Sequence, residues 1–246
     1  FLHGGFRPYA STFLIFSEYA KNAIRMSSLM HLPVIYVFTH DSIGLGEDGP
    51  THQSVEQLST LRVIPGMSVW RPADVTETAL SWKFSLDKLS GPSSLILTRQ
   101  TLPELKRSKN QIESIQKGGY VIHDCGKKID AIIISSGSEL HICIEAAENL
   151  HKNGILVRVI SMPCMEQFMI QPKAYRDKTL PPDIENVLAV EAGIGVCWDK
   201  FIGKRGAKIV MESFGLSAPG QEALTYFGFT KNNIVKSIKK LIKTNG

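Results

Sequence analysis

Pro33-Val-Ile-Tyr-Val-Phe-Thr39 is a short apolar run rich in β-branched and aromatic residues, which predicts a buried β-strand. The fourteen residues that follow are His40-Asp-Ser-Ile-Gly-Leu-Gly-Glu-Asp-Gly-Pro-Thr-His-Gln53, with two imidazoles, three carboxylates and three glycines. We call this segment the polar turn. A helical pattern over Thr51–Arg62 comes next. Strand, polar turn and helix in this order predict a βα unit, and ligands of open α/β sheets bind beyond the carboxyl ends of the strands.

The same alternation continues on both sides of a break. Ser68–Arg71 and Ser94–Arg99 are further strand candidates, and a helix is predicted over Asp74–Leu89 with Asp74 as its cap. Strands separated by helices of this length predict parallel βαβ units. The later strand candidates are Ala131–Ser136, Leu156–Ser161, Val187–Glu191 and Lys208–Ser213. The later helix candidates are Ser138–Asn153, stopped by Gly154, and Lys231–Lys243.

Thr101–Gly119 is polar and charged, contains Pro103 and ends in Gly118-Gly119, so we predict a linker there. The predicted fold class is α/β, with two consecutive, open, mostly parallel βα domains at about 1–115 and 116–246.

Composition limits the class of protein. The chain has 246 residues and 43% apolar content, and its net charge of +5 is spread along its length, so nucleic acid is not an expected partner. No apolar run approaches the roughly 20 residues that span a bilayer, so no membrane partner is expected either. The four cysteines have no zinc spacing. Cys143, Cys164 and Cys197 have apolar neighbours, which predicts mostly buried free thiols in a reducing, cytoplasmic compartment. The chain begins at Phe1 without a methionine, and we expect it to be a C-terminal fragment, or a processed chain, of something longer.

The polar turn allows several interpretations. Gly44-Leu-Gly-Glu-Asp-Gly49 matches the dinucleotide pattern G-x-G-x-x-G, but Glu47 and Asp48 would repel a pyrophosphate and Pro50 offers no amide. A purely structural turn and a metal site of His40, Asp41, Asp48 and His52 are two other options, although the spacing matches no familiar metal pattern. The fourth is a site for hydroxylated or anionic substrates, because carboxylates accept hydrogen bonds from hydroxyls and imidazoles shuttle protons.

Other candidate residues lie outside the polar turn. Phe13, Phe16 and Tyr19 are three apart, a spacing that covers one flank of a helix and either packs in a core or stacks on a planar heterocycle. Arg99, at a predicted strand end, either grips a phosphate or forms a surface salt bridge. For Arg71 we favour a structural role.

Several motifs together resemble those of the transketolases, thiamine-diphosphate enzymes that move two-carbon units between sugar phosphates. The resemblance covers essentially the whole chain. Its strongest motifs are Gly5-Phe-Arg-Pro-Tyr-Ala-Ser-Thr-Phe-Leu-Ile-Phe16, the polar turn with Thr39, and Trp70-Arg-Pro-Ala-Asp74. It continues through Leu97-Thr-Arg-Gln100, Gly118-Gly-Tyr-Val121, Ser136-Gly-Ser-Glu139, Arg158-Val-Ile-Ser-Met-Pro163, Val190-Glu-Ala-Gly193 and Phe227-Gly-Phe-Thr230.

The resemblance implies a role for each candidate residue. The aromatic row Phe13, Phe16 and Tyr19 would line the pocket for the aminopyrimidine ring of thiamine diphosphate. His40 and Arg99 would hold the phosphate of a sugar-phosphate substrate, and Asp48 would accept from a substrate hydroxyl. His52 would bind the donor's oxygen and assist proton transfer, which makes it the expected catalytic residue.

The resemblance also implies what the chain lacks. The cofactor's diphosphate would be bound through Mg²⁺ or Ca²⁺ by a preceding domain with a Gly-Asp-Gly…Asn motif, and the family's activating glutamate would precede Phe1. Residues 1–115 are therefore expected to be an incomplete pyrimidine-binding domain, followed by a transketolase C-terminal domain. We expect homodimers and no activity from the chain alone. The alternatives are a non-catalytic dimerisation module and a beta-type subunit of a split thiamine-diphosphate enzyme.

Overall fold

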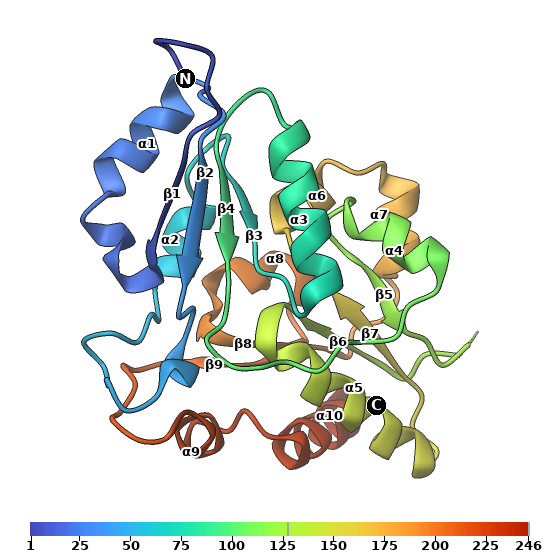
Figure 1. Ribbon diagram of the computed structural model, residues 1–246. Helices are drawn as coiled ribbons and strands as arrows, with labels where there is room; N and C mark the ends of the chain where they lie inside the picture. Colours follow the sequence, from blue (N-terminus) through green and yellow to red (C-terminus); the bar gives the residue numbers. More distant parts are fainter. Residues whose placement is uncertain (127, 246) are drawn as a thin grey trace.

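The computed structural model describes residues 1–126 and 128–245, and within them the strands form two sheets (Figure 1). The first is a four-stranded parallel sheet in the order β1-β2-β4-β3. Its strands are β1 (Tyr9–Phe13), β2 (Ile35–Thr39), β3 (Ser68–Trp70) and β4 (Ser93–Ile96). The register pairs Phe13 with Thr39, so β1 and β2 end side by side and deliver their following residues to the same edge.

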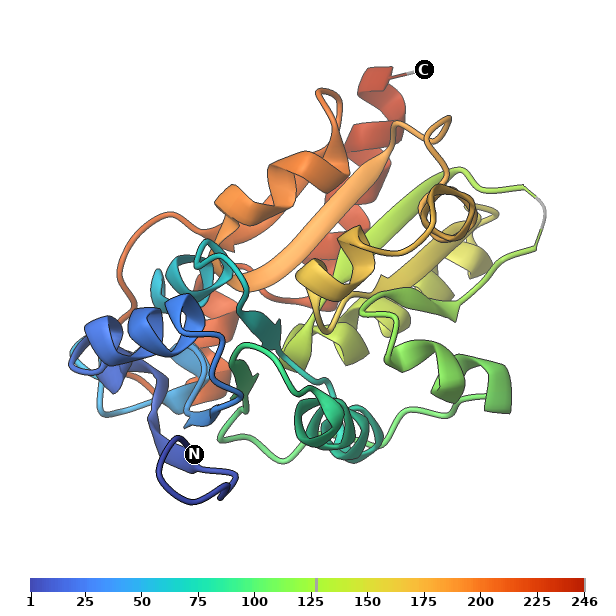
Figure 2. The same ribbon diagram turned by 90° about the horizontal axis from the view of Figure 1, so that it is seen from above.

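The second sheet has five described strands in the order β5-β7-β6-β8-β9. They are β5 (Tyr120–His123), β6 (Ala131–Ser135), β7 (Val157–Ser161), β8 (Val187–Ile194) and β9 (Ala207–Met211). Only β5 runs antiparallel among them. The central strands β6, β7 and β8 are buried on both faces, as expected for a parallel sheet that is covered by helices. Figures 1 and 2 show the two sheets in separate halves of the molecule.

Helices cover both sheets. In the first half these are η1 (Leu14–Glu18), α1 (Lys21–Leu29), η2 (Ile43–Leu45), α2 (Gln57–Arg62), α3 (Val75–Asp87) and α4 (Lys109–Ile115). In the second half they are η3 (Gly137–Glu139), α5 (Leu140–Lys152), α6 (Met165–Met169), α7 (Lys173–Thr179), η4 (Gly195–Trp198), α8 (Asp199–Ile202), α9 (Gly220–Tyr226) and α10 (Lys231–Asn245).

Local signals explain several of these elements. Asp74 caps α3 by accepting a hydrogen bond from the Glu77 amide at 3.0 Å. Gly154 has φ +76° directly after the last turn of the α5 segment, which is the left-handed stop that was predicted. Helix α10 packs Ile234, Ile238 and Leu241 inward, against α5 and the second sheet.

Three of the predicted elements are wrong in their bounds. The strand predicted over Ser94–Arg99 stops at Ile96, so Arg99 lies in the loop beyond it. The helix predicted from Thr51 begins only at Gln57, and the Gln53 side chain before it donates to carbonyl groups of the polar turn. The linker predicted over Thr101–Gly119 contains helix α4, started by a capping box between Ser108 and Gln111.

The aromatic row does not lie on one helix, as its spacing had predicted. Phe13 is the last residue of β1, Phe16 lies in η1, and Tyr19 follows η1. The division into domains at about residue 115 stays a prediction.

Buried charges join the two halves. Arg71, directly after β3, is fully buried and bonds to Asp41 of the first half and Glu139 of the second. Arg62 on α2 makes two hydrogen bonds to Glu191 on β8, at 2.7 and 2.8 Å. These pairs support the structural role that was favoured for Arg71.

Candidate active site

The polar turn lies at the carboxyl end of β2, where it was expected. Its backbone includes η2 and three residues of positive φ: His40 (+58°), Gly46 (+101°) and Gly49 (+76°). Positive φ is ordinary for glycine but uncommon for a residue with a Cβ, so the surrounding structure must hold His40 in place.

The aromatic row stands beside the polar turn. The ring of Phe13 stacks on that of His40, with centroids 3.7 Å apart and planes at 21°. Phe16 continues the stack 5.9 Å from Phe13, and Tyr19 lies 6.0 Å beyond Phe16. His52 meets Phe16 edge-on at 5.6 Å. Five rings from two parts of the chain thus form one aromatic surface.

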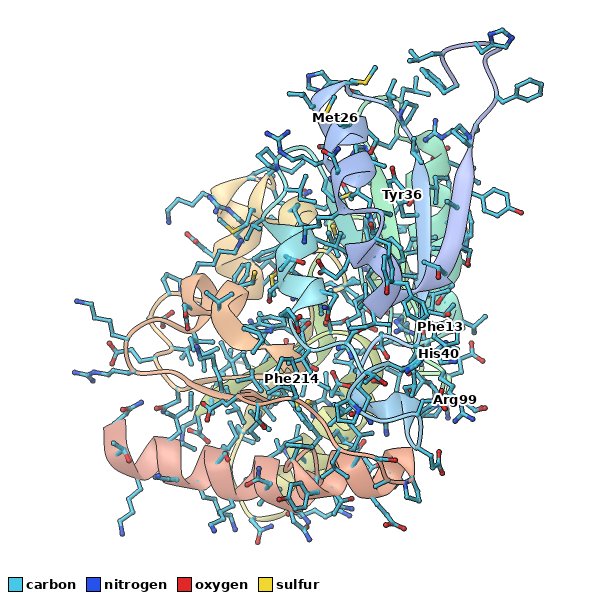
Figure 3. The ribbon with its side chains drawn as sticks, turned by 90° about the vertical axis from the view of Figure 1, so that its left-hand side faces the viewer. Phe13, Met26, Tyr36, His40, Arg99 and Phe214 are labelled. Carbon is cyan, nitrogen blue, oxygen red and sulfur yellow. The ribbon has the colours of Figure 1, made fainter. Side chains whose placement is uncertain are left out.

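This aromatic surface is accessible. Phe13 and Phe16 are half-buried, and Tyr19 is 89% exposed. Figure 3 shows Phe13, His40 and Arg99 following one another along one side of the molecule. A planar ring could stack on such an exposed row of aromatic side chains.

Charges of both signs act on His40. Burial lowers the pKa of His40, and the positive charge of Arg99 lowers it further, while Asp48 and Asp41 act in the opposite direction. The net effect lowers the pKa, so the neutral imidazole is favoured. Arg99 and Asp48 are exposed, unlike Asp41, which is buried. An exposed cation, Arg99, and an exposed carboxylate, Asp48, therefore act on a half-buried imidazole.

His52 lies at the far end of the polar turn and is half-buried. Its Nδ1 is 3.0 Å from the Thr51 hydroxyl, which leaves Nε2 as the other ring nitrogen for hydrogen bonding. An imidazole can both donate and accept a hydrogen bond, so His52 is a candidate for contact with a bound ligand.

The second half of the chain forms one wall of the polar turn, which sequence reasoning missed. The Gln53 side-chain amide donates to Gly46 O and to Leu216 O, both at 2.9 Å, and the Ser217 hydroxyl donates to Glu47 O at 2.5 Å. Figure 1 shows the polar turn beside α9, whose first residue is Gly220.

The close packing at this wall explains a pair of glycines. A Cβ on Gly220 would lie 2.5 Å from the Gly44 carbonyl oxygen, and a Cβ on Gly44 would lie 1.7 Å from the Gln100 side-chain nitrogen. Gly44 thus allows both α9 and the Gln100 side chain to pack closely against its backbone. In the sequence, only the glycine itself indicated this close packing.

Two of the alternative interpretations find no support in this geometry. No group of three or more His, Cys, Asp or Glu side chains among residues 1–126 and 128–245 is placed to hold a metal ion, which disfavours the metal site proposed for His40, Asp41, Asp48 and His52. A dinucleotide site needs a helix that opens at the third glycine, whereas the first helix after Gly49 begins at Gln57. In the part of the chain that the structure covers, no helix has the length and hydropathy to span a bilayer.

Comparison with known proteins identifies the family. The family model of the transketolase pyrimidine-binding domain matches residues 1–104, and that of the transketolase-like C-terminal domain matches residues 118–230. The transketolase of Buchnera aphidicola is 50% identical over 242 residues, which are 98% of this chain and 36% of that protein.

Solved structures agree. A Pichia stipitis transketolase in complex with sedoheptulose-7-phosphate matches with a TM-score of 0.90 and 38% identity, over 96% of this chain and 34% of that chain. A split-gene transketolase, described as an inactive beta4 tetramer, matches with a TM-score of 0.75 and 25% identity, over 97% of this chain and 77% of that chain. The chain spans about a third of the length of the curated relatives it matches. Its two α/β units are those of the pyrimidine-binding and C-terminal domains, and the chain belongs to the transketolase family.

Proposed function

We propose that the chain forms one part of a transketolase active site, in which a two-carbon ketol unit passes from a ketose phosphate to an aldose phosphate with thiamine diphosphate as cofactor. The observation that carries this proposal is the convergence of the aromatic row, two imidazoles, Asp48 and Arg99 at the ends of β1, β2 and β4.

The aromatic row fits the ring part of the cofactor. Phe13 and Phe16 are stacked on each other, Tyr19 is tilted against Phe16, and all three rings are partly exposed, so a planar ring can stack on the outer face of the row. When bound, thiamine diphosphate supplies the electron sink for cleavage of a carbon–carbon bond. The described residues offer no comparable place for Mg²⁺ or Ca²⁺, and we assign the metal and the diphosphate to other parts of the protein.

The charged residues fit a sugar phosphate. Arg99 and His40 hold the phosphate, since a guanidinium donates two parallel hydrogen bonds and an imidazole adds a third. Asp48 accepts from a substrate hydroxyl, and His52 binds the substrate's oxygen and moves a proton at Nε2.

Titration of the 246-residue chain with fructose 6-phosphate, followed by NMR of ¹⁵N-labelled histidines, tests the phosphate grip. We expect the His40 resonances to shift, and Arg99→Ala to weaken binding about tenfold or more, because a charge-assisted pair contributes roughly 1.5–3 kcal/mol. Arg25→Ala is the matched control, since Arg25 is also exposed but lies on α1. Equal affinities of the two variants would contradict the assignment of Arg99.

We propose further that the 246 residues have no transketolase activity alone. The family's Gly-Asp-Gly…Asn motif does not occur in them. A coupled assay of the purified chain with thiamine diphosphate, magnesium and two sugar phosphates measures this directly. Turnover above the cofactor-only blank would disprove it.

A second candidate is the beta-type subunit of a split enzyme. It is supported by the likeness to the split-gene transketolase, which shows that such subunits exist among the structures that this chain resembles. In either case we propose self-association, as a homodimer or higher assembly. Sedimentation equilibrium with and without a separately expressed diphosphate-binding domain of a transketolase distinguishes a subunit that captures this domain from a dimerisation module that does not.

A further inference from the structure

We propose that the second half of the chain positions the polar turn through a buried row of charges, in which Glu139 acts on Asp41 through Arg71. The geometry of this row stands by itself, and its meaning for substrate binding rests on the proposed function. Glu139 and Arg71 are positioning residues, because neither lies at the aromatic surface or in the polar turn.

Arg71 is the centre of the row. Its side chain is about 1% exposed, and its Nε donates to Asp41 Oδ2 at 2.9 Å. Its Nη1 and Nη2 donate to the two oxygens of Glu139 at 2.5 and 3.1 Å, and Nη1 also donates to Ser136 O at 2.8 Å. One guanidinium therefore holds a carboxylate of the polar turn and a carboxylate of the second half.

The second half also fixes the backbone of Arg71. The Arg71 amide donates to Pro163 O at 2.8 Å, and the Gly137 amide donates to Arg71 O at 3.0 Å. Gly137 has φ +62°, and a Cβ there would lie 2.6 Å from Arg71 Cζ. The guanidinium is thus packed against η3 with no room to move.

The polar turn depends on this support at His40. His40 has φ +58°, which a residue with a Cβ rarely adopts and which persists only where the surrounding structure imposes it. Asp41 follows His40 directly and is held by Arg71. Release of Asp41 would therefore let the backbone at His40 return to an ordinary conformation and turn the imidazole away from Phe13.

The helix that follows the polar turn is tied to the same half. Its last residue, Arg62, bonds to Glu191, whose Oε1 also accepts from the Ser136 hydroxyl at 2.5 Å. Glu191 is 3.9 Å from Arg71, so the tie at Asp41 and the tie at Arg62 belong to one connected cluster.

A second buried set provides a matched control. Glu77 accepts from Arg107 at 3.3 Å, from Tyr120 at 2.7 Å and from Ser161 at 2.6 Å, and these partners come from both halves of the chain. No residue that these bonds join to Glu77 lies in the polar turn. Glu77 is as buried as Glu139, so loss of either charge weakens the packing between the halves, but only Glu139 is linked to Asp41.

The test compares Glu139→Gln with Glu77→Gln in the 246-residue chain. Amide hydrogen exchange is measured by mass spectrometry over peptides that cover residues 40–53, and the His40 side chain is observed by NMR. We expect Glu139→Gln to increase exchange in these peptides about tenfold and to shift the His40 resonance, while Glu77→Gln leaves both at the wild-type values. Equal exchange in the two variants, or an unchanged His40 resonance in Glu139→Gln, would overturn the proposal.

Two further measurements keep the positioning role testable if Glu139→Gln does not fold, and separate it from the proposed function. If Glu139→Gln does not fold, Asp41→Asn takes its place, with the same expected increase and the same refuting result. Titration with fructose 6-phosphate then asks whether the loosened turn binds the sugar phosphate more weakly, with about a tenfold loss expected in Glu139→Gln and none in Glu77→Gln. Absence of binding by the wild type would refute the phosphate grip, whereas the exchange comparison would still decide the positioning role.

Discussion

Replacement of Arg71 by methionine removes the central charge of the buried cluster and tests how much of the stability depends on it. Methionine fills a similar volume, so the effect is mainly electrostatic. Asp41 keeps the Ser42 hydroxyl at 3.1 Å, and Glu139 keeps the Ala192 amide at 3.0 Å, but both carboxylates lose their cation in a buried place.

The magnitude follows from this geometry. Loss of one partner of a buried ion pair costs roughly 3–5 kcal/mol, and the hydrogen bonds that remain favour the lower end, about 3 kcal/mol. For a chain of this size, each kcal/mol lost from the free energy of unfolding lowers the melting temperature by about 2–4 °C. We therefore expect Arg71→Met to lower the melting temperature by roughly 6–12 °C in circular dichroism at pH 7.

The control is Arg205→Met, because Arg205 and Glu185 form a pair whose side chains are 58% and 56% exposed. An exposed pair contributes about 0–1 kcal/mol, so this variant should melt within a few degrees of the wild type. If Arg71→Met and Arg205→Met melt at the same temperature, the reasoning about the buried cluster is wrong.

The pH dependence gives an independent check. Burial alone would raise the pKa of Glu191, but Arg62 and Arg71 with the Ser136 hydroxyl outweigh it, so the pKa lies below its ordinary value. A lowered carboxyl pKa contributes stability above its unfolded value of about 4.3, and this contribution is lost as the pH falls through the folded pKa. We expect the difference between wild type and Arg71→Met to narrow as the pH is lowered from 7 to below about 4.

Three further predictions concern other parts of the chain. The pKa of His40 should be below 6.5 by NMR titration and should rise when fructose 6-phosphate binds, since an anion favours the imidazolium; a value above 6.5 in the free chain would contradict the effect of burial and Arg99. Gly220→Ala should destabilise the chain by roughly 1–3 kcal/mol in urea unfolding, because its Cβ would meet the Gly44 carbonyl oxygen at 2.5 Å; an unchanged midpoint would show that α9 shifts freely. Burial raises the pKa of the Cys143 and Cys164 thiols, so both should react with a disulfide reagent only after unfolding, and rapid reaction of the native chain at either thiol would contradict their burial.

Elements with a local signal were predictable from the sequence. The strand ending at Thr39 needed only its apolar β-branched run, and α3 needed only its Asp74 cap. By contrast, β1 has the composition Tyr-Ala-Ser-Thr-Phe and is mostly exposed at the edge of its sheet, so no apolar run marks it. The missed strand also hid the reason why Phe13 stacks on His40, which is the register of β1 against β2.

The site was predictable in part. Its residue types pointed to phosphate, hydroxyl and ring binding, and the structure places Phe13, Phe16, His40 and His52 together. Their individual roles stay proposals. The contact between the polar turn and the segment leading into α9 could not be predicted. Gln53 and Leu216 are 163 positions apart, and no sequence pattern at either residue indicates the other as its partner. The periodicity of apolar residues indicates which face of a helix or strand is buried. It does not indicate which other segment of the chain packs against that face.

The docking of α9 on the polar turn has a consequence for protein engineering. The Gly44–Gly220 contact leaves no space for even one methyl group, and the Gln53 side-chain amide donates a hydrogen bond to the backbone carbonyl of Leu216. A chimera that joins this first half to the C-terminal domain of a distant relative would therefore alter the conformation of the polar turn as well as stability. In such hybrids the conformation of the polar turn should follow the origin of the α9 segment, although that segment contributes none of the residues of the polar turn.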